Sequence, residues 1–387
     1  METKELLRKV VNIYSVFPNE KELAEFLENH LRDLGFKVQR QHIEEKRFNI
    51  LAEKGEGEKS ILFYAHMDTV PVYGDWKTDP FTLTEEGDIL FGRGTSDMKA
   101  GIVAILKAIE NKNPKNFKIK IAFGVDEENI SEGGHALVNS PWCKDIIAAI
   151  IPETGLTTEP SIGPQAIILG RRGRAAYSLK VPGFSVHGAS SEGVNAIEEA
   201  SKIIMNIKKL PLRKHEKLPP SSLFIRSINS EAGSLSIPEK TEIIIDRHLV
   251  PPETKETVLE EIKKFIDELY DLEILSVVNG KKVEVEIQKR KTPYLDPYIT
   301  DEFHPFTQFV SKFVKEKYGK AIYRYGLSVA DENLFGSVLK IPTIVIGPLS
   351  GNCHSANEWV SYRSIEELRE IFSKIIENFP RYCEHDI

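Results

Sequence analysis

Apolar residues recur three and four positions apart in two segments near the start of the chain. The segments are residues 3–16 (TKELLRKVVNIYSV) and 19–34 (NEKELAEFLENHLRDL). This spacing puts the apolar side chains on one face of a helix, so both segments are predicted to be amphipathic helices. Gly35 follows the second segment, and glycine is a typical residue at a helix C-terminus.

Short runs rich in isoleucine, valine and phenylalanine come next and predict buried strands. The runs are RFNILAE, SILFYAH, KIKIAFGV and DIIAAII, and the helix-patterned DMKAGIVAILKAIE lies between the second and the third. Strands that alternate with helices indicate an α/β layer. The pattern resumes late in the chain with helical PFTQFVSKFVKEKYG, a buried strand in IPTIVIGP, and a last helix predicted to start at a Ser-x-x-Glu box of Ser364 and Glu367.

The sequence pattern changes in the middle of the chain, at about residue 174. Strand-like AAYSLKVPG, helical NAIEEASKIIMNIKKL and TKETVLEEIKKFIDELYD, and strand-like KKVEVEIQ indicate a compact α+β unit. We therefore predict that residues 174–289 form an inserted α+β domain and that residues 1–173 and 290–387 form the two parts of one α/β domain. A chain of 387 residues has room for both, because single cores rarely grow beyond about 250 residues.

Composition and charge exclude several classes of protein. The chain has 51 basic and 58 acidic residues, a formal net charge of −7, and no basic block, so we expect neither a nucleic-acid nor a membrane partner. Its longest purely apolar run, residues 146–151, is far shorter than the roughly 20 residues of a membrane-spanning helix. The N-terminus lacks a secretory pattern, and three widely spaced cysteines fit no disulfide framework. We expect a cytoplasmic protein with a small-molecule or peptide partner.

Polar residues stand where the predicted strands end. His66 and Asp68 follow ILFYA, Glu127 and Glu128 follow IAFGV, and Glu153 follows IIAAII. Open α/β sheets bind ligands at the carboxyl ends of their strands, where separate loops converge. These loops are therefore predicted to build one site.

Taken singly, each of these residues also has an ordinary structural interpretation. A histidine at a strand end such as His66 often makes only a structural hydrogen bond. Asp97 in the glycine-rich GRGTSDMKAG directly precedes a predicted helix, where aspartate is a common N-cap.

The adjacent Glu127 and Glu128 would repel each other in a partly buried setting, and a cation would remove that repulsion. A solvated pair at a strand end remains the alternative. With His354 in GNCHSANE, the set of two histidines and several carboxylates suits zinc, manganese or cobalt.

Several segments in this order resemble a known family, the co-catalytic zinc amidohydrolases that include acetylornithine deacetylase, succinyl-diaminopimelate desuccinylase, aminoacylase and carboxypeptidase G. The segments are AHMDTVP, GDWKTDPF, GRGTSDMKAG, VDEEN, PETG, VHGASSEGVNAI, DRHLVP and GPLSGNCHSANEWV. They extend over nearly the whole chain. The resemblance implies an α/β zinc-peptidase-like catalytic core, a mixed sheet flanked by helices, with the inserted α+β domain as a lid and dimerisation domain.

The resemblance also implies roles for individual residues. Asp68 is expected to orient His66 through a hydrogen bond, Glu127 to act as the general base, and His187 to reach an active site from the lid across a homodimer. Arg247 is a candidate clamp for a substrate carboxylate, and a salt bridge at the edge of a sheet is the alternative. The expected ligands of two divalent ions, zinc or else cobalt or manganese, are His66, Asp97, Glu128, Glu153 and His354, with Asp97 between the ions.

The family resemblance predicts a metal-dependent amide hydrolase that removes the acyl group from an N-acyl amino acid. A carboxypeptidase or dipeptidase of the same family is the alternative, and an inactive binding or scaffold homologue is the remote one. PETG stands where the family usually has Glu-Pro-Thr-Gly, so Glu159 is a second possibility for the role of Glu153.

Three further residues near these segments have an ordinary structural interpretation as well as a functional one. Asp331 and Glu332 lie where family members carry a substrate-side loop, but acidic residues are also frequent at helix starts. Cys353 adjoins His354, and we interpret it as a packed thiol because neighbouring side chains would point in different directions.

Overall fold

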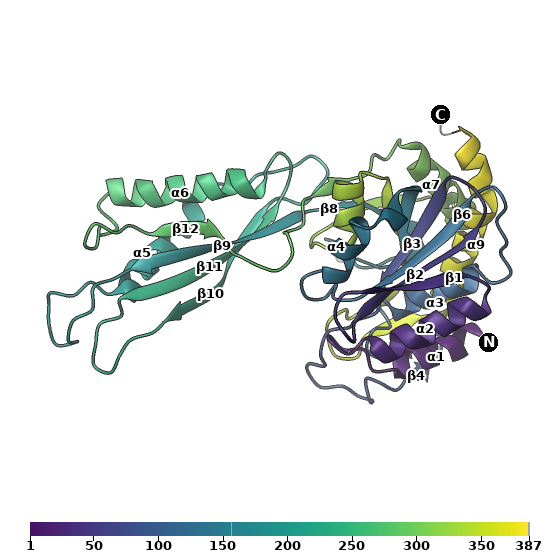
Figure 1. Cartoon of the computed structure of the whole chain (residues 1–387), viewed down its shortest axis with the longest axis horizontal. Helices are drawn as coiled ribbons and strands as arrows, with labels where there is room; N and C mark the ends of the chain where they lie inside the picture. The colour runs from purple at the N-terminus through teal and green to yellow at the C-terminus, as the bar shows by residue number, and fades with distance from the viewer. Residues whose placement is uncertain (156, 386–387) are drawn as a thin grey trace. The chain divides into compact units, whose positions relative to one another are not determined.

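The computed structural model describes residues 1–155 and 157–385, and it has the α/β architecture that the sequence predicts (Figure 1). The chain divides into two compact units, one of Met1–Arg171 with Tyr298–Ile387 and the other of Arg172–Pro297. The second unit extends beyond the predicted insertion at both ends. Residues 290–297 stay with it in part because the backbone carbonyl of Leu295 accepts a hydrogen bond from the N–H of Arg174.

A mixed sheet forms the centre of the first unit, with the strand order β1-β2-β6-β3-β7-β15-β8-β13 and with β14 beside β8. Its strands are β1 (Lys37–His42), β2 (Phe48–Gly55), β3 (Ser60–His66), β6 (Lys118–Gly124), β7 (Ile146–Ile151), β8 (Ala166–Arg171), β13 (Tyr298–Ile299), β14 (Ile322–Gly326) and β15 (Thr343–Val345). The four predicted runs are β2, β3, β6 and β7. Every residue of β3 is buried, as expected for a strand covered on both faces.

Helices pack on both faces of this sheet. Phe63 of β3 packs edge-on against Phe372 on one face, and its neighbour Tyr64 packs against Phe335 on the other, because successive side chains of a strand point to opposite faces. The helical segments are α1 (Thr3–Asn12), α2 (Lys21–Asp33), α3 (Lys99–Ala108), α4 (Glu132–Val138), η1 (Pro141–Cys143), η2 (Gly163–Gln165), α7 (Pro305–Tyr318), α8 (Glu332–Leu334), η4 (Phe335–Leu339) and α9 (Tyr362–His385).

The first unit also contains a smaller sheet with the strand order β16-β17-β5-β4. Its strands are β4 (Thr84–Glu86), β5 (Ile89–Phe91), β16 (Ser350–Gly351) and β17 (Trp359–Ser361). Because β16 and β17 flank residues 352–358 and β5 leads into residues 92–98, this sheet ties two site-bearing loops together.

The second unit is an antiparallel sheet with the order β10-β11-β9-β12 and with helices packed on it. Its core includes Tyr177, Ile245, Ile262 and Leu269, each of which is at most 1% exposed. Its elements are β9 (Gly173–Pro182), α5 (Ala196–Asn206), η3 (Ile207–Lys209), β10 (Ser222–Ser230), β11 (Lys240–Leu249), α6 (Lys255–Asp271) and β12 (Glu284–Ile287).

Two helix ends differ from the sequence prediction. The first helix stops at Asn12 rather than near residue 16, because the following segment is extended and Val16 forms a parallel bridge with Thr69. The last helix begins at Tyr362, so Ser364 lies inside it and accepts a hydrogen bond from the N–H of Leu349. Among the described residues, no helix is long and apolar enough to cross a membrane.

Candidate active site

The register of the main sheet brings the predicted strand-end residues to one edge. In the parallel pair of β3 and β6, His66 lies opposite Gly124, three residues before Glu127. In the parallel pair of β7 and β15, Ile151 lies opposite Val345, so the loop with Glu153 and the loop that leads to His354 start side by side.

The His66 ring is held in one orientation by the backbone of its own loop. Its Nδ1 lies 2.9 Å from the backbone carbonyl oxygen of Asp68. A carbonyl oxygen only accepts, so Nδ1 donates to it, and Nε2 faces Asp97 Oδ1, 2.9 Å away. The carboxylate of Asp68, which we expected to make this bond, is 3.7 Å from Nδ1.

The Asp68 carboxylate instead organises the loop of the paired glutamates. It accepts the backbone N–H of Glu128 at 2.9 Å and that of Glu127 at 3.3 Å. Burial raises the pKa of Asp68 to about 7, although His66 opposes this. The physical role of Asp68 in this structure is therefore to fix the turn that presents Glu127 and Glu128.

Asp97 lies between two imidazoles. Its second oxygen is 3.2 Å from His354 Nε2, and that nitrogen is 3.1 Å from Glu128. Two groups of possible metal ligands result, His66 with Asp97 and Glu128, and Asp97 with Cys353 and His354, and each has its ligand atoms within 4.8 Å of one another. Asp97 belongs to both groups, as a carboxylate between two ions must.

The chemistry of this donor set fits divalent cations. His66 Nε2 and an Asp97 oxygen are 2.9 Å apart, so either a proton or a cation must lie between these two atoms. Burial opposes ionisation of Asp97, but His354 and His66 overcome this and lower its pKa well below the usual range. Imidazole and carboxylate are ligands of zinc, manganese and cobalt.

Glu127 lies beside these groups without belonging to either. Its Oε2 is 4.0 Å from His66 Nε2, and its side chain is 13% exposed. Burial raises the pKa of Glu127 well above its usual range, and Glu128 adds to this while His66 opposes it. A carboxylate with a raised pKa accepts a proton more readily than an ordinary one, which suits a general base.

Sequence reasoning missed Glu358, which holds the loop that carries Asp97. One oxygen of its fully buried carboxylate accepts the N–H groups of Ser96 at 2.7 Å and Asp97 at 3.0 Å. The other oxygen accepts the N–H of Gly94 at 3.0 Å and pairs with Arg93 at 2.7 Å. The available signal was the single acidic residue of GNCHSANE, four residues after His354.

Glu153 has an arginine partner. Its carboxylate accepts a hydrogen bond from Arg171 at 2.8 Å, and the same guanidinium pairs with Glu332. Glu153 belongs to neither of the two ligand groups among the described residues. Asp331, the neighbour of Glu332 in sequence, is also buried and accepts a hydrogen bond from the hydroxyl of Tyr64. Asp331 and Glu332 thus both face the interior.

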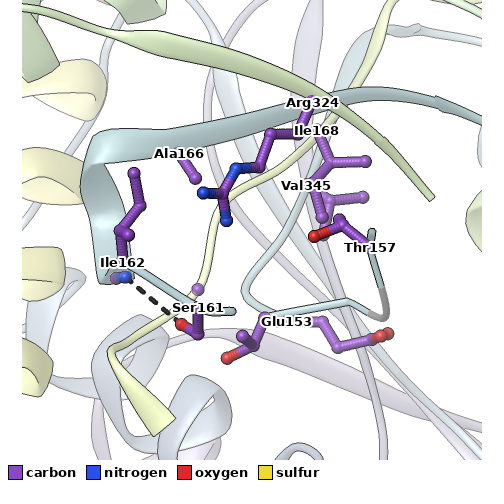
Figure 2. Close-up of a pocket in the computed structure, with 11 residues that line it drawn as sticks. Glu153, Thr157, Ser161, Ile162, Ala166, Ile168, Arg324 and Val345 are labelled. Carbon is purple, nitrogen blue, oxygen red and sulfur yellow. Dashed lines mark hydrogen bonds between the residues drawn. The ribbon is translucent and has the colours of Figure 1, made fainter. Parts of the chain in front are cut away.

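A small pocket lined in part by Glu153 is shown in Figure 2. Ser161, Ile162 and Arg324 line it, among others, and the guanidinium of Arg324 pairs with Glu159 at 2.8 Å. Glu159, which is 66% exposed, is thus bound to Arg324 and is in neither ligand group of the described residues.

The two remaining predicted residues belong to the second unit. His187 is exposed and its Nδ1 accepts the N–H of Ala189 at 3.2 Å. Arg247 is 1% exposed, pairs with Glu253 and donates to the carbonyl of Pro211 at 2.8 Å. Arg247 is therefore in a salt bridge, although its partner lies in the segment after β11 rather than in the sheet, and a buried, paired guanidinium offers no surface to a substrate.

Comparisons with known proteins agree with this geometry. The sequence pattern that defines "Peptidase family M20/M25/M40" matches residues 62–378. The succinyl-diaminopimelate desuccinylase of Nautilia profundicola is 24% identical over 98% of this chain and 100% of its own. The acetylornithine deacetylase of Klebsiella pneumoniae is 28% identical over 95% of this chain and 92% of its own.

Solved structures share the fold at lower identity. An M20 family metallo-carboxypeptidase from Sulfolobus solfataricus superposes with a TM-score of 0.77 at 18% identity, covering 98% of this chain and 100% of its own. A dinuclear metal-binding peptidase of the M20 family from Bacillus subtilis has a TM-score of 0.71 at 14% identity, covering 97% of this chain and 95% of its own.

Proposed function

Because the chain belongs to peptidase family M20/M25/M40 and is therefore a hydrolase of amide bonds, we propose that its substrates are N-acyl amino acids, from which it removes the acyl group. The relatives with matching length are named as a desuccinylase and a deacetylase, which supports this choice. The single observation that carries the chemistry is the position of Asp97, shared by His66 and His354 on its two oxygens.

We assign two divalent ions, most simply zinc, to the groups around Asp97. When bound, such a pair lowers the pKa of a water molecule and polarises the amide carbonyl. His66, Asp97, Glu128 and His354 hold the pair, and cobalt or manganese would satisfy the same donors. We propose that Glu153, whose carboxylate is paired with Arg171 in this structure, is a further ligand of the ions.

Glu127 is proposed as the general base. Its carboxylate oxygen lies 4.0 Å from His66 Nε2, close enough for both atoms to contact one water molecule. It takes the proton of the attacking water and returns it to the departing amine, since an amine leaves poorly unless it is protonated. Asp68 keeps Glu127 in place through the backbone bonds described above.

The test is Glu127→Gln, which keeps the size of the side chain and removes the base. The variant is expected to bind the same metal content as the wild type and to lose about 10²- to 10⁴-fold in kcat, the usual contribution of a positioned general base. Metal content is read by elemental analysis and turnover with N-acetyl and N-succinyl amino acids. A metal-replete Glu127→Gln protein with normal turnover would exclude this role.

A carboxypeptidase or dipeptidase activity is the second candidate, favoured by the peptidases among the solved structures. The same panel decides between them when simple dipeptides with a free carboxylate are added. Higher kcat/KM for N-acyl amino acids supports the deacylase, and the reverse ratio supports the peptidase.

We further propose that the second unit forms a homodimer through β10. This strand is at the edge of its sheet, and Phe224 and Ile228 are 47% and 45% exposed on it. An exposed apolar edge is a template for pairing with another strand. Sedimentation of the wild type beside an Ile228→Lys variant tests this, and a monomeric wild type would refute it. His187 is the lid residue that such a dimer would use.

A further inference from the structure

Cys353 lies on the same carboxylate as His354. Its Sγ is 3.1 Å from Asp97 Oδ2, and His354 Nε2 is 3.2 Å from that same oxygen. Sulfur, nitrogen and carboxylate oxygen thus meet within 4.8 Å, which satisfies the spacing of a metal site. The expectation that neighbouring side chains diverge is wrong at this place.

The backbone explains how two consecutive side chains reach one point. His354 has a φ of +59° and Asn352 a φ of +56°, both in the left-handed region that few non-glycine residues adopt. In an extended segment the side chains of residues 353 and 354 would point to opposite sides. The left-handed turn at His354 brings them to the same side, and such conformations gather at functional sites.

The buried Cys143 shows what a packed thiol is like in this chain. Cys143 donates to the backbone carbonyl of Leu137 at 3.2 Å and belongs to neither of the two ligand groups among the described residues. Cys353, by contrast, is exposed, so apolar packing does not account for its place. Its partner is a carboxylate that the site already uses.

We propose that Cys353 is a thiolate ligand of the ion held by Asp97 and His354. This inference rests on the proposed function, because it assumes that an ion binds there. On binding, the S–H bond breaks, the proton leaves to solvent and a sulfur–metal bond forms. A thiolate, an imidazole and a carboxylate form a donor set that zinc accepts, and soft sulfur favours zinc or cadmium over manganese.

The experiment uses the full-length protein loaded with Co²⁺, whose absorption reports sulfur ligation. The wild type is expected to show a near-ultraviolet sulfur-to-cobalt charge-transfer band. Cys353→Ser should lose that band and weaken metal binding by more than the roughly 10- to 100-fold that loss of an outer-sphere partner costs. Cys353→Asp should restore binding without the band. Cys383→Ser, which changes a cysteine outside both ligand groups of the described residues, is the matched control.

The outcomes separate the two proposals. If the wild type binds two ions and cleaves N-acyl amino acids but its cobalt spectrum equals that of Cys353→Ser, Cys353 is not a ligand and the proposed function stands. If the wild type binds no ion, both fail. If Cys353→Ser is unfolded by circular dichroism, Cys353→Asp and the wild-type spectrum still decide the question.

Discussion

Replacing Glu358 by glutamine tests whether a buried acid outside the ligand groups sets the position of Asp97. The carboxylate accepts three backbone N–H groups, of Gly94, Ser96 and Asp97, and pairs with Arg93. Glutamine has one oxygen, so its NH₂ group must face two of these donors. The bonds are charge-assisted and each contributes about 1.5–3 kcal/mol.

The expected loss is about 3–5 kcal/mol of unfolding free energy, the usual cost of leaving one partner of a buried ion pair alone. That is a large share of the about 5–15 kcal/mol that stabilises a typical domain. Because the loop of residues 94–97 loses its anchor, Asp97 also shifts, and metal binding should weaken by about 10- to 100-fold, as for other outer-sphere changes.

Urea unfolding and metal titration measure the two effects on the same protein. Glu377→Gln is the control, since its side chain is 55% exposed and its pairing with Lys112 lies at the surface. We expect less than about 1 kcal/mol for that change. Metal affinity of Glu358→Gln equal to the wild type, whatever its stability, would refute the claim that Glu358 positions Asp97.

Three other outcomes are expected. Burial and then Arg172 lower the pKa of His248 to about 4, so between about pH 6.5 and pH 4 the unfolded chain binds a proton at this residue and the folded chain does not. The free energy of unfolding should therefore fall by up to about 3 kcal/mol as the pH drops through this window. Urea unfolding should show that this part of the pH dependence is missing in His248→Asn. Gly101→Ala should destabilise despite the better helix propensity of alanine, because the new Cβ would lie 2.1 Å from the carbonyl oxygen of Pro152; thermal unfolding checks this, and a raised melting temperature would contradict it. Chelation should lower the melting temperature, because the carboxylates around Asp97 then repel one another, and calorimetry after zinc is restored should show recovery.

The strands and the residues at their ends could be predicted because buried parallel strands read as continuous apolar runs. β3 and β7 are such runs, and their register carries His66 and Glu153 to one edge without further assumptions. The pairing of Asp97 with both histidines was expected from family resemblance alone, since residues 66, 97 and 354 are too far apart in sequence for spacing to relate them. The roles of these residues stay predictions.

Other features depend on contacts that the sequence does not state. The end of the first helix at Asn12 is set by the bridge from Val16 to Thr69, which lies in a different segment. Arg247 was a candidate substrate clamp by family resemblance, but in the structure its partner is the buried Glu253. The left-handed backbone at His354 likewise brought Cys353 into the site against the expectation of diverging side chains.

The acidic residues of this site fall into two classes, and the backbone separates them. The oxygens of Asp68 and Glu358 accept hydrogen bonds from main-chain N–H groups, which leaves fewer of their lone pairs free for a cation. Asp97 and Glu128 face imidazole nitrogens instead, so they are the ones that still need a cation. The sequence does not separate the two classes, since Asp68 and Glu128 both follow an apolar run. The number of N–H donors on each carboxylate is therefore the physical criterion for choosing metal ligands, and it places Asp68 among the residues that shape the site rather than those that bind the ions.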